Sequence, residues 1–119
     1  MNNFRNLRVW QDAHKIAVDV YRLTKKFPKD ELFGLTSQVR RAVLSIPTNI
    51  VEGCGRSTNK DFIHFLIIAR GSNQEVLYLL FFAWDLKLIT GKEYQVIDKR
   101  LNDLCAGINA LIRKIETLN

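Results

Sequence analysis

Apolar residues recur at alternating spacings of four and three in two long stretches of the chain, and this periodicity constrains the fold more than any other feature. Such spacing places the side chains on one helical face, which must then be buried against other helices. The first stretch contains Val9, Ala13, Ile16, Val20, Leu23 and Phe27, and the second contains Ile97, Leu101, Leu104, Ile108, Leu111, Ile115 and Leu118. Both stretches predict long helices of a bundle.

Local signals divide the chain into four helices, at residues 5–27, 34–53, 59–88 and 91–118. Pro28 ends the first helix, and Gly53 and Gly55 are stop signals for the second. Thr58 and Thr90 are each followed three residues later by an acidic residue, which is typical of helix starts. No strand pattern competes, so we predict an all-α antiparallel up-down four-helix bundle that forms a single domain over residues 1–119.

The composition is that of a folded soluble protein, with 47% hydrophobic and 25% charged residues. Residues 1–8 lead into a charged helix without the apolar segment of a signal peptide. The longest apolar run, Val76–Trp84, is far too short to cross a bilayer. We therefore expect a cytoplasmic protein with no membrane partner.

The helix expected at residues 34–53 carries a line of polar side chains beside its apolar face. The line consists of Gln38, Arg41, Ser45, Asn49 and Glu52, and we call it the polar stripe. Polar groups in an interface need partners, so we expect this stripe to be paired, with Glu75 of the next helix as a candidate partner of Arg41. Pro47 should bend the same helix near Val43, and whether the bend serves packing or function stays open.

The helix expected at residues 59–88 is apolar on all sides, unlike the other three. A helix of this kind is buried all round, which a single four-helix bundle cannot achieve. We therefore predict a homo-oligomer in which a second subunit covers this helix, packed closely at Gly71-Ser72. The large side chains expected at the interface are Tyr78, Phe81, Phe82 and Trp84.

The net charge of +6 is concentrated in the first helix, where residues 5–27 carry six Lys or Arg against two Asp. Asp12 and Asp19 alternate with the basic residues, as in a solvated ladder of ion pairs. The other interpretation is a stripe that faces phosphates, since a basic surface attracts nucleic acid. That stripe would consist of Arg5, Arg8, Lys15, Arg22, Lys25 and Lys26.

No set of residues in the sequence has the spacing of a catalytic or metal site. His14 and His64 each stand without a cysteine or carboxylate at ligand spacing. Cys54 and Cys105 form no redox motif, and we expect both to be free thiols. The sequence therefore predicts a protein that is not an enzyme and that uses no cofactor and no metal.

Several short motifs together resemble one family. They are Leu7, Trp10, Phe27-Pro28, Gly34-Leu35, Gln38, Arg40-Arg41-Ala42, Ser45-Ile46, Asn49-Ile50, Glu52-Gly53, Phe62, Phe65-Leu66, Ala69, Gly71-Ser72 and Glu75. The chain resembles the 23S rRNA intervening-sequence proteins, which are four-helix bundles encoded within bacterial large-subunit ribosomal RNA genes. Through that family it is also similar to the accessory variability proteins of diversity-generating retroelements.

The resemblance implies a barrel-like homopentamer without catalytic residues. The retroelement relatives bind nucleic acid and a reverse transcriptase through basic surface. We therefore expect a non-catalytic oligomeric scaffold that binds RNA, DNA or a ribonucleoprotein such as the ribosome. The alternative is an adaptor for a protein partner such as a reverse transcriptase.

Overall fold

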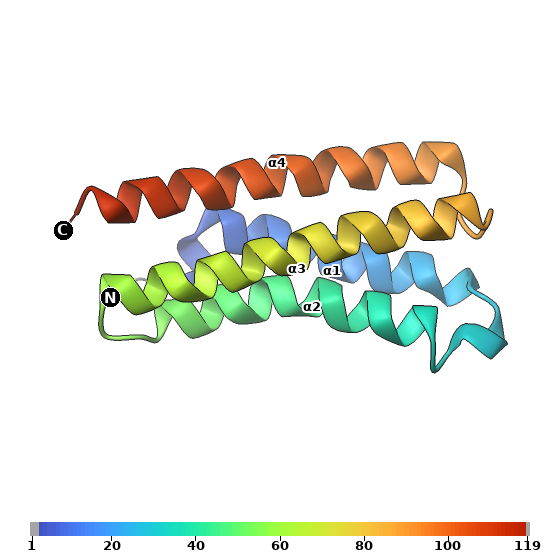
Figure 1. Cartoon of the computed structure of the whole chain (residues 1–119), viewed down its shortest axis with the longest axis horizontal. Coiled ribbons are helices and arrows are strands. Elements are labelled where there is room, and N and C mark those ends of the chain that lie inside the picture. Colours follow the sequence, from blue (N-terminus) through green and yellow to red (C-terminus); the bar gives the residue numbers. More distant parts are fainter. Residues whose placement is uncertain (1–2, 119) are drawn as a thin grey trace.

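The computed structural model describes residues 3–118, whose helices lie side by side in a body of 47 × 24 × 20 Å (Figure 1). The four α-helices are α1 (Arg8–Leu23), α2 (Leu35–Cys54), α3 (Asn59–Asp85) and α4 (Gly91–Glu116). Short 3-10 turns lie at Phe4–Asn6, Thr24–Lys26 and Lys29–Glu31. Residues 3–118 contain no β-strand, so the predicted all-α class is confirmed. None of the described helices has both the length and the apolar character that a membrane span requires.

The arrangement places α3 between α2 and α4, with α1 behind them in Figure 1. The α1–α2 connector and the α3–α4 turn lie at the right-hand end of that view, and the α2–α3 turn lies at the left. Contacts are most extensive between α2 and α3 and sparsest between α1 and α4. Hollows can therefore form along the α1–α4 seam, and the α2–α3 pair is the best packed part of the bundle.

Most residues of the two predicted apolar seams lie in the core, and about half of the buried apolar residues come from α2 and α3. In α1, Val9, Ala13, Ile16 and Val20 are buried, and Phe27 beyond the helix is buried as well. In α4 the buried residues are Ile97, Leu101, Leu104, Ile108, Ile112 and Ile115. The seam predicted for α4 is wrong at its C-terminal end. Ile112 is buried where Leu111 was expected, and Leu118 is 67% exposed because α4 ends at Glu116.

Both predicted helix starts are confirmed. The Thr58 side chain accepts a hydrogen bond from the Asp61 N–H at 3.1 Å. At α4 the Thr90 hydroxyl accepts from the Glu93 N–H at 3.1 Å, and the Glu93 carboxylate accepts from the Thr90 N–H at 2.8 Å. These bonds satisfy backbone donors that have no partner inside the helix.

Several helix ends differ from the prediction. The first α-helix ends at Leu23 instead of at residue 27, and a 3-10 turn at Thr24–Lys26 follows it. The first α-helix begins at Arg8 because Leu7 has an extended backbone (φ −82°, ψ 125°) between the turn at Phe4–Asn6 and the helix. The third ends at Asp85, three residues early, because Lys87 adopts a left-handed conformation with φ 63°. The Leu88 N–H then bonds back to the Ala83 carbonyl at 2.9 Å. This helix ending usually contains glycine, so its sequence signal is absent here.

Pro47 lies inside α2, which continues through it as one helix. Proline cannot donate to the carbonyl four residues earlier, at Val43. In the next turn, side chains bond to the backbone of the preceding turn. The Thr48 hydroxyl donates to the Leu44 carbonyl at 2.7 Å, and the Asn49 amide donates to the Ser45 carbonyl at 2.8 Å. These bonds support the helix around the proline.

Of the two glycines expected to stop α2, Gly53 lies within the last turn of the helix and has a packing role. A Cβ at this position would lie 2.7 Å from Cδ1 of Phe62 and 3.2 Å from Cβ of Phe65. Real Cβ atoms are not found as close as 2.7 Å to another heavy atom. The absence of a side chain at Gly53 therefore lets the end of α2 approach the start of α3. The stop itself is at Gly55, which caps the helix.

Gly53→Ala is expected to lower the free energy of unfolding by about 1–3 kcal/mol, because the Phe62 ring must move to admit the methyl group. Gly55→Ala is the matched control, since a Cβ there meets its nearest neighbour at an ordinary 3.5 Å. Chemical denaturation of the two variants measures the difference. Equal midpoints would show that the ring adapts without cost.

Candidate nucleic-acid and subunit interfaces

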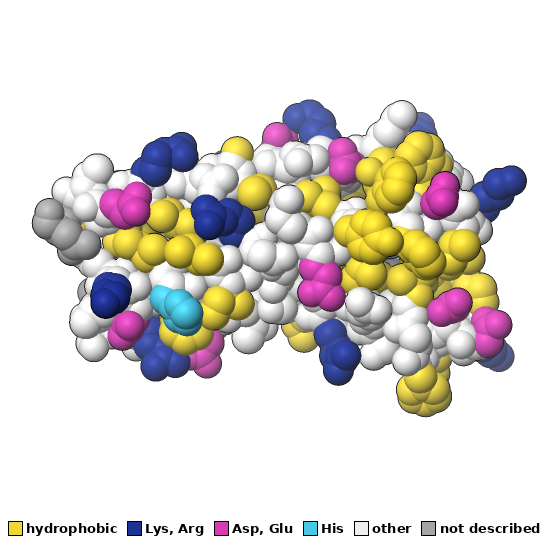
Figure 2. All heavy atoms as spheres, in the orientation of Figure 1, with side chains coloured by type: hydrophobic (Ala, Val, Ile, Leu, Met, Phe, Trp, Pro, Cys, Tyr) yellow, Lys and Arg dark blue, Asp and Glu magenta, His cyan; other side chains and the backbone are white. Residues whose placement is uncertain are grey.

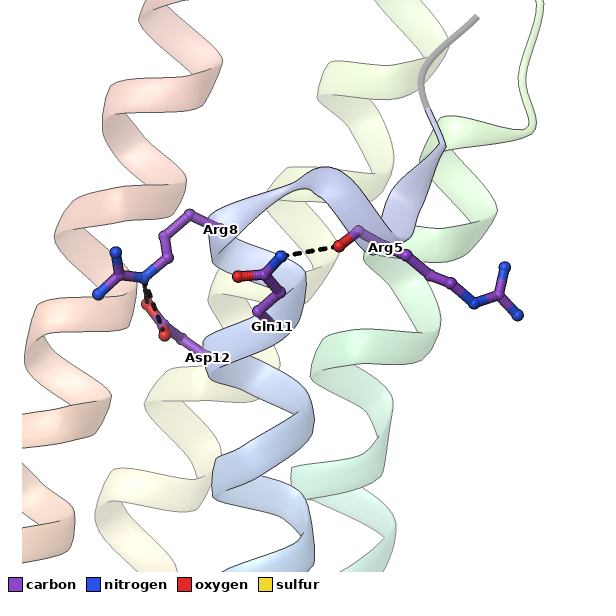
Figure 3. A network of polar contacts seen from close by, with 4 residues as sticks. All are labelled: Arg5, Arg8, Gln11 and Asp12. Carbon is purple, nitrogen blue, oxygen red and sulfur yellow. Dashed lines mark hydrogen bonds and ion pairs between the residues drawn. The ribbon is translucent and has the colours of Figure 1, made fainter.

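Two basic residues of α1, Arg8 and Arg22, form ion pairs with the acidic residues between them. Nε of Arg8 lies 3.2 Å from both carboxylate oxygens of Asp12 (Figure 3). Nη1 of Arg22 lies 3.7 Å from Oδ1 of Asp19, whose other oxygen accepts from Arg100 at 2.8 Å. Arg8 and Arg22 therefore belong to the solvated ladder. Each such exposed pair contributes only about 0.3–0.5 kcal/mol.

The other four residues of the expected basic stripe have different surroundings. The Arg5 guanidinium lies 4.5 Å from the centre of the Phe4 ring and points away from the bond between Gln11 and the Arg5 carbonyl (Figure 3). Lys26 forms an ion pair with Glu93 of α4, and this hydrogen bond is the main cause of the lowered pKa of Glu93. Within residues 3–118, Lys15 and Lys25 have no hydrogen bond or ion pair. The stripe is thus not one continuous surface of free cations.

A second group of cations was missed by the sequence analysis, which did not connect Lys29 and Arg40 with Lys25. These three residues line a hollow of about 220 Å³ beside the α1–α2 connector, which we call the basic hollow. Its other lining residues are Thr24, Phe27, Pro28, Leu32 and Thr36. No carboxylate lines it. By contrast, acidic residues line two hollows along the α1–α4 seam. Asp19 and Glu93 line one of them, and Asp12 and Asp103 line the other.

The middle of the polar stripe is paired inside the chain, as expected. The Ser45 and Ser72 hydroxyls lie 2.8 Å apart between α2 and α3, and the Asn49 amide donates to the Ser45 hydroxyl at 3.0 Å. Glu52 lies 3.4 Å from Arg56, an exposed pair on the same turn of the chain. The Ser45–Ser72 contact therefore joins α2 to α3, and Ser45 and Asn49 are both half-buried.

The expected partner of Arg41 within the chain is wrong. Arg41 and Glu75 are exposed, and no ion pair joins either of them to another residue of the described chain; Gln38 is exposed as well. The two charges nevertheless lie at similar heights. Arg41 is four residues before Ser45 on α2 and Glu75 is three residues after Ser72 on α3, so each is about one turn from the Ser45–Ser72 contact. Their side chains point outward, which prevents the pairing within one subunit.

A buried Arg41–Glu75 pair would make Arg41→Ala far more destabilising than Arg22→Ala, but Arg41 forms no such pair. Removing one partner of a buried ion pair is costly, because the other charge stays buried without a partner. Removing an exposed cation that has no partner leaves no such charge behind. Within one subunit, Arg41→Ala and Arg22→Ala are now both expected to change the free energy of unfolding by less than about 0.5 kcal/mol.

The outer surface of α3 carries large apolar side chains that the other helices do not cover. Tyr78 is 61% exposed, and Phe81, Phe82 and Trp84 are each exposed by about two fifths. Figure 2 shows hydrophobic side chains gathered over the right-hand ends of α3 and α4. To their left, the surface consists mostly of backbone and of side chains that are neither hydrophobic nor charged. The predicted excess of apolar surface on this helix is thus present in the structure.

A second heptad-like series runs along the outside of α3, with spacings of four and three. It consists of His64, Ile68, Gly71, Glu75, Tyr78 and Phe82, and we call it the outer seam. All six residues are exposed. Gly71 lies at its middle, and a Cβ there would meet nothing within 4 Å. Nothing inside the subunit explains a glycine that costs the helix about 1 kcal/mol relative to alanine.

The residues that titrate or react form no group suited to chemistry in the described part of the chain. His14 stacks on Trp10 with ring centres 5.0 Å apart, and His64 meets the Phe65 ring edge-on. No three His, Cys, Asp or Glu residues among positions 3–118 converge as metal ligands. Cys54 and Cys105 are free thiols, and burial raises the pKa of Cys54.

Known proteins share this sequence and fold. A solved structure of a protein of unknown function from the S23 ribosomal protein family of Bacteroides thetaiotaomicron VPI-5482 is 25% identical to this chain. The alignment covers 88% of this chain and 95% of that one, with a TM-score of 0.82. No curated protein matches. The model of the family described as 23S rRNA-intervening sequence protein matches residues 5–110. The chain belongs to the 23S rRNA-intervening sequence protein family.

Proposed function

We propose that this protein is a non-catalytic, cytoplasmic homo-oligomeric scaffold that binds nucleic acid or a ribonucleoprotein through its basic surface. Each subunit is an antiparallel up-down bundle. A pentamer is the favoured assembly, because the resemblance to the intervening-sequence proteins implies one. The proposal assigns the outer seam to contacts between subunits and the free cations to the nucleic acid.

The observation that carries the proposal is the outer seam of α3. Large apolar side chains that are exposed together on one face are typical of interaction sites in soluble proteins. The spacing of the seam matches that of a helix packed against another helix, and the open position at Gly71 allows a close approach. A second copy of the chain supplies both a helix of suitable length and the opposite charge for Glu75, namely Arg41.

The net charge supports the nucleic-acid part of the proposal. Each chain carries a net charge of +6. Some described cations are neutralised by a carboxylate, as Arg8 is by Asp12, but others have no such partner. Assembly brings several copies of each cation to one particle, so weak single contacts add through avidity. Binding of this kind weakens steeply with salt and has little sequence preference.

One observation favours the adaptor function instead. Trp84 and Tyr94 stack with ring centres 4.6 Å apart, and Phe81 meets both rings edge-on. Together they form an aromatic surface where α3 ends and α4 begins. Exposed aromatic residues are typical anchors of protein interfaces. A protein partner such as a reverse transcriptase could use this surface if the subunits leave it uncovered.

Two measurements on the purified protein test the proposal. Sedimentation equilibrium should give a mass several times the 13.8 kDa of one chain, and a dilute sample at 13.8 kDa would refute the oligomer. RNA or DNA should be retained at about 50 mM salt and released as salt rises. A stable oligomer that retains neither would remove the nucleic-acid function and leave the adaptor function in its place.

A further inference from the structure

The basic hollow adjoins a second hollow that also has no acidic lining. The second hollow, of about 350 Å³, is lined by Tyr21, Leu32, Phe33, Thr36, Ser37, Arg40 and Arg41. Leu32, Thr36 and Arg40 line both hollows. The two therefore form one surface at the α1–α2 end of the subunit, and every charged side chain that lines it is a cation.

Arg40 is held in place at the centre of this surface without a carboxylate. Its Nε donates to the Thr24 hydroxyl at 2.9 Å, and its Nη2 donates to the Tyr21 carbonyl at 3.2 Å. The guanidinium also lies 4.9 Å from the centre of the Tyr21 ring. A guanidinium has five N–H donors, so three remain for a ligand. The charge is permanent, oriented and not neutralised, which suits phosphate.

Lys25 and Lys29 also line the basic hollow. Both are exposed, and neither has an ion pair or hydrogen bond with another residue of the described range 3–118. The neighbouring carboxylates are those of Asp30 and Glu31, which line neither hollow. Glu31 accepts a hydrogen bond from the Leu35 N–H at 3.2 Å and so caps α2. Three cations thus face one hollow in which no carboxylate compensates them.

The start of α2 adds unpaired polar groups to the same surface. No hydrogen bond of residues 3–118 satisfies the backbone N–H of Thr36 or Ser37, because both belong to the first turn of the helix. The Thr36 hydroxyl is buried and has no hydrogen-bond partner there either. The helix start carries partial positive charge, which favours an anion beside it.

Phe33 indicates which kind of phosphate compound fits. Its ring is 95% exposed beside Arg40 and Tyr21, although an apolar ring in water is unfavourable. Single-stranded nucleic acids combine a charged backbone with unpaired bases, and proteins bind them with cations and stacking aromatic rings. A duplex hides its bases and cannot use the ring in this way.

We propose that the basic hollow, with Lys25, Lys29 and Arg40, binds backbone phosphates of single-stranded nucleic acid while Phe33 stacks on a base. The site rests on the proposed nucleic-acid function and gives it a location and a strand preference. It lies on the side of α2 that faces α1, because Arg40 bonds to Thr24 and Tyr21. The outer seam of α3 stays available for a second subunit.

The test compares two double charge reversals that give the same net charge. Lys25→Glu with Lys29→Glu changes the basic hollow, and Arg8→Glu with Arg22→Glu changes the ladder of α1. Fluorescence anisotropy with labelled oligo(U), oligo(dT) and a duplex of equal length measures the affinities over a range of salt. The hollow variant should bind single strands about tenfold more weakly, with a salt slope shallower by about 1.4, and the ladder variant should lose less than about threefold.

Phe33→Ala tests the stacking, with Leu118→Ala as an exposed apolar control at the other end of the bundle. Phe33→Ala should weaken binding of oligo(U) and oligo(dT) by about fivefold or more and leave duplex binding unchanged. Comparison of oligo(U) with oligo(dT) then distinguishes RNA from DNA as the preferred strand.

Different results would overturn the single-strand site and the nucleic-acid function. Equal losses for the two charge reversals, or equal losses of single strands and duplex for Phe33→Ala, would overturn the site while wild-type binding keeps the function. No binding of any strand by the wild-type protein would overturn both.

Discussion

Gly71→Leu is expected to convert the assembled protein into folded monomers. The position is exposed at the middle of α3, and a Cβ there would have open space around it. The substitution therefore causes no clash within the subunit, and it replaces glycine with a better helix former, worth up to about 1 kcal/mol. In the assembly, the added side chain would fill the space that lets a neighbouring helix approach.

Sedimentation equilibrium measures the result as a fall to 13.8 kDa, and circular dichroism should show unchanged helix content. Ala110→Leu is the control, because Ala110 is an exposed small residue on α4 that lies outside the outer seam. It should keep the mass of the wild-type assembly. If Gly71→Leu keeps that mass too, the outer seam is not a contact between subunits.

The features that the sequence predicts correctly are those encoded by neighbours along the chain. The two seams, which contain Val20 on α1 and Leu101 on α4, are predicted from spacing alone, because burial follows the helical period. The capping residues Thr58 and Thr90 act within one turn of their own position. The end of α3 is equally local, but Lys87 there adopts a conformation that its side chain does not signal.

The features that the sequence does not predict depend on residues far apart in the chain. Asn73 is wholly buried among apolar residues, and its amide donates to the Leu101 carbonyl of α4 at 3.0 Å. Arg40 belongs with Lys25 and Lys29 because the connector brings the end of α1 to the start of α2. The spacing of residues along one helix cannot predict either arrangement, since each depends on how two elements pack against each other.

The polar stripe shows where helical spacing stops being informative. Spacing correctly placed Arg41 near the height of Glu75, but it could not tell whether the two side chains turn toward each other or toward a neighbour. The structure has both exposed. Opposite charges that lie at one height on different helices can pair between subunits when a symmetry axis runs along the bundle, because such an axis keeps every residue at its height.

Arg41→Glu and Glu75→Arg are therefore each expected to weaken the assembly, since each places like charges opposite one another between subunits. An equal mixture of the two variants should assemble again, because the glutamate introduced in one faces the arginine introduced in the other. An odd-numbered ring leaves one mismatched contact, so recovery of the assembly mass should be partial there and complete in an even-numbered ring. Sedimentation velocity of each variant and of the mixture measures these masses.

The mixture separates pairing between subunits from pairing within one. A chain that carries both substitutions restores opposite charges in either case, so its assembly would not distinguish the two. Only subunits of different charge that meet in one particle can restore each other. If the single variants dissociate and the mixture stays dissociated, Arg41 and Glu75 do not pair between subunits. If the single variants stay assembled, the two charges lie outside the contact, and only the apolar part of the outer seam is left to form it.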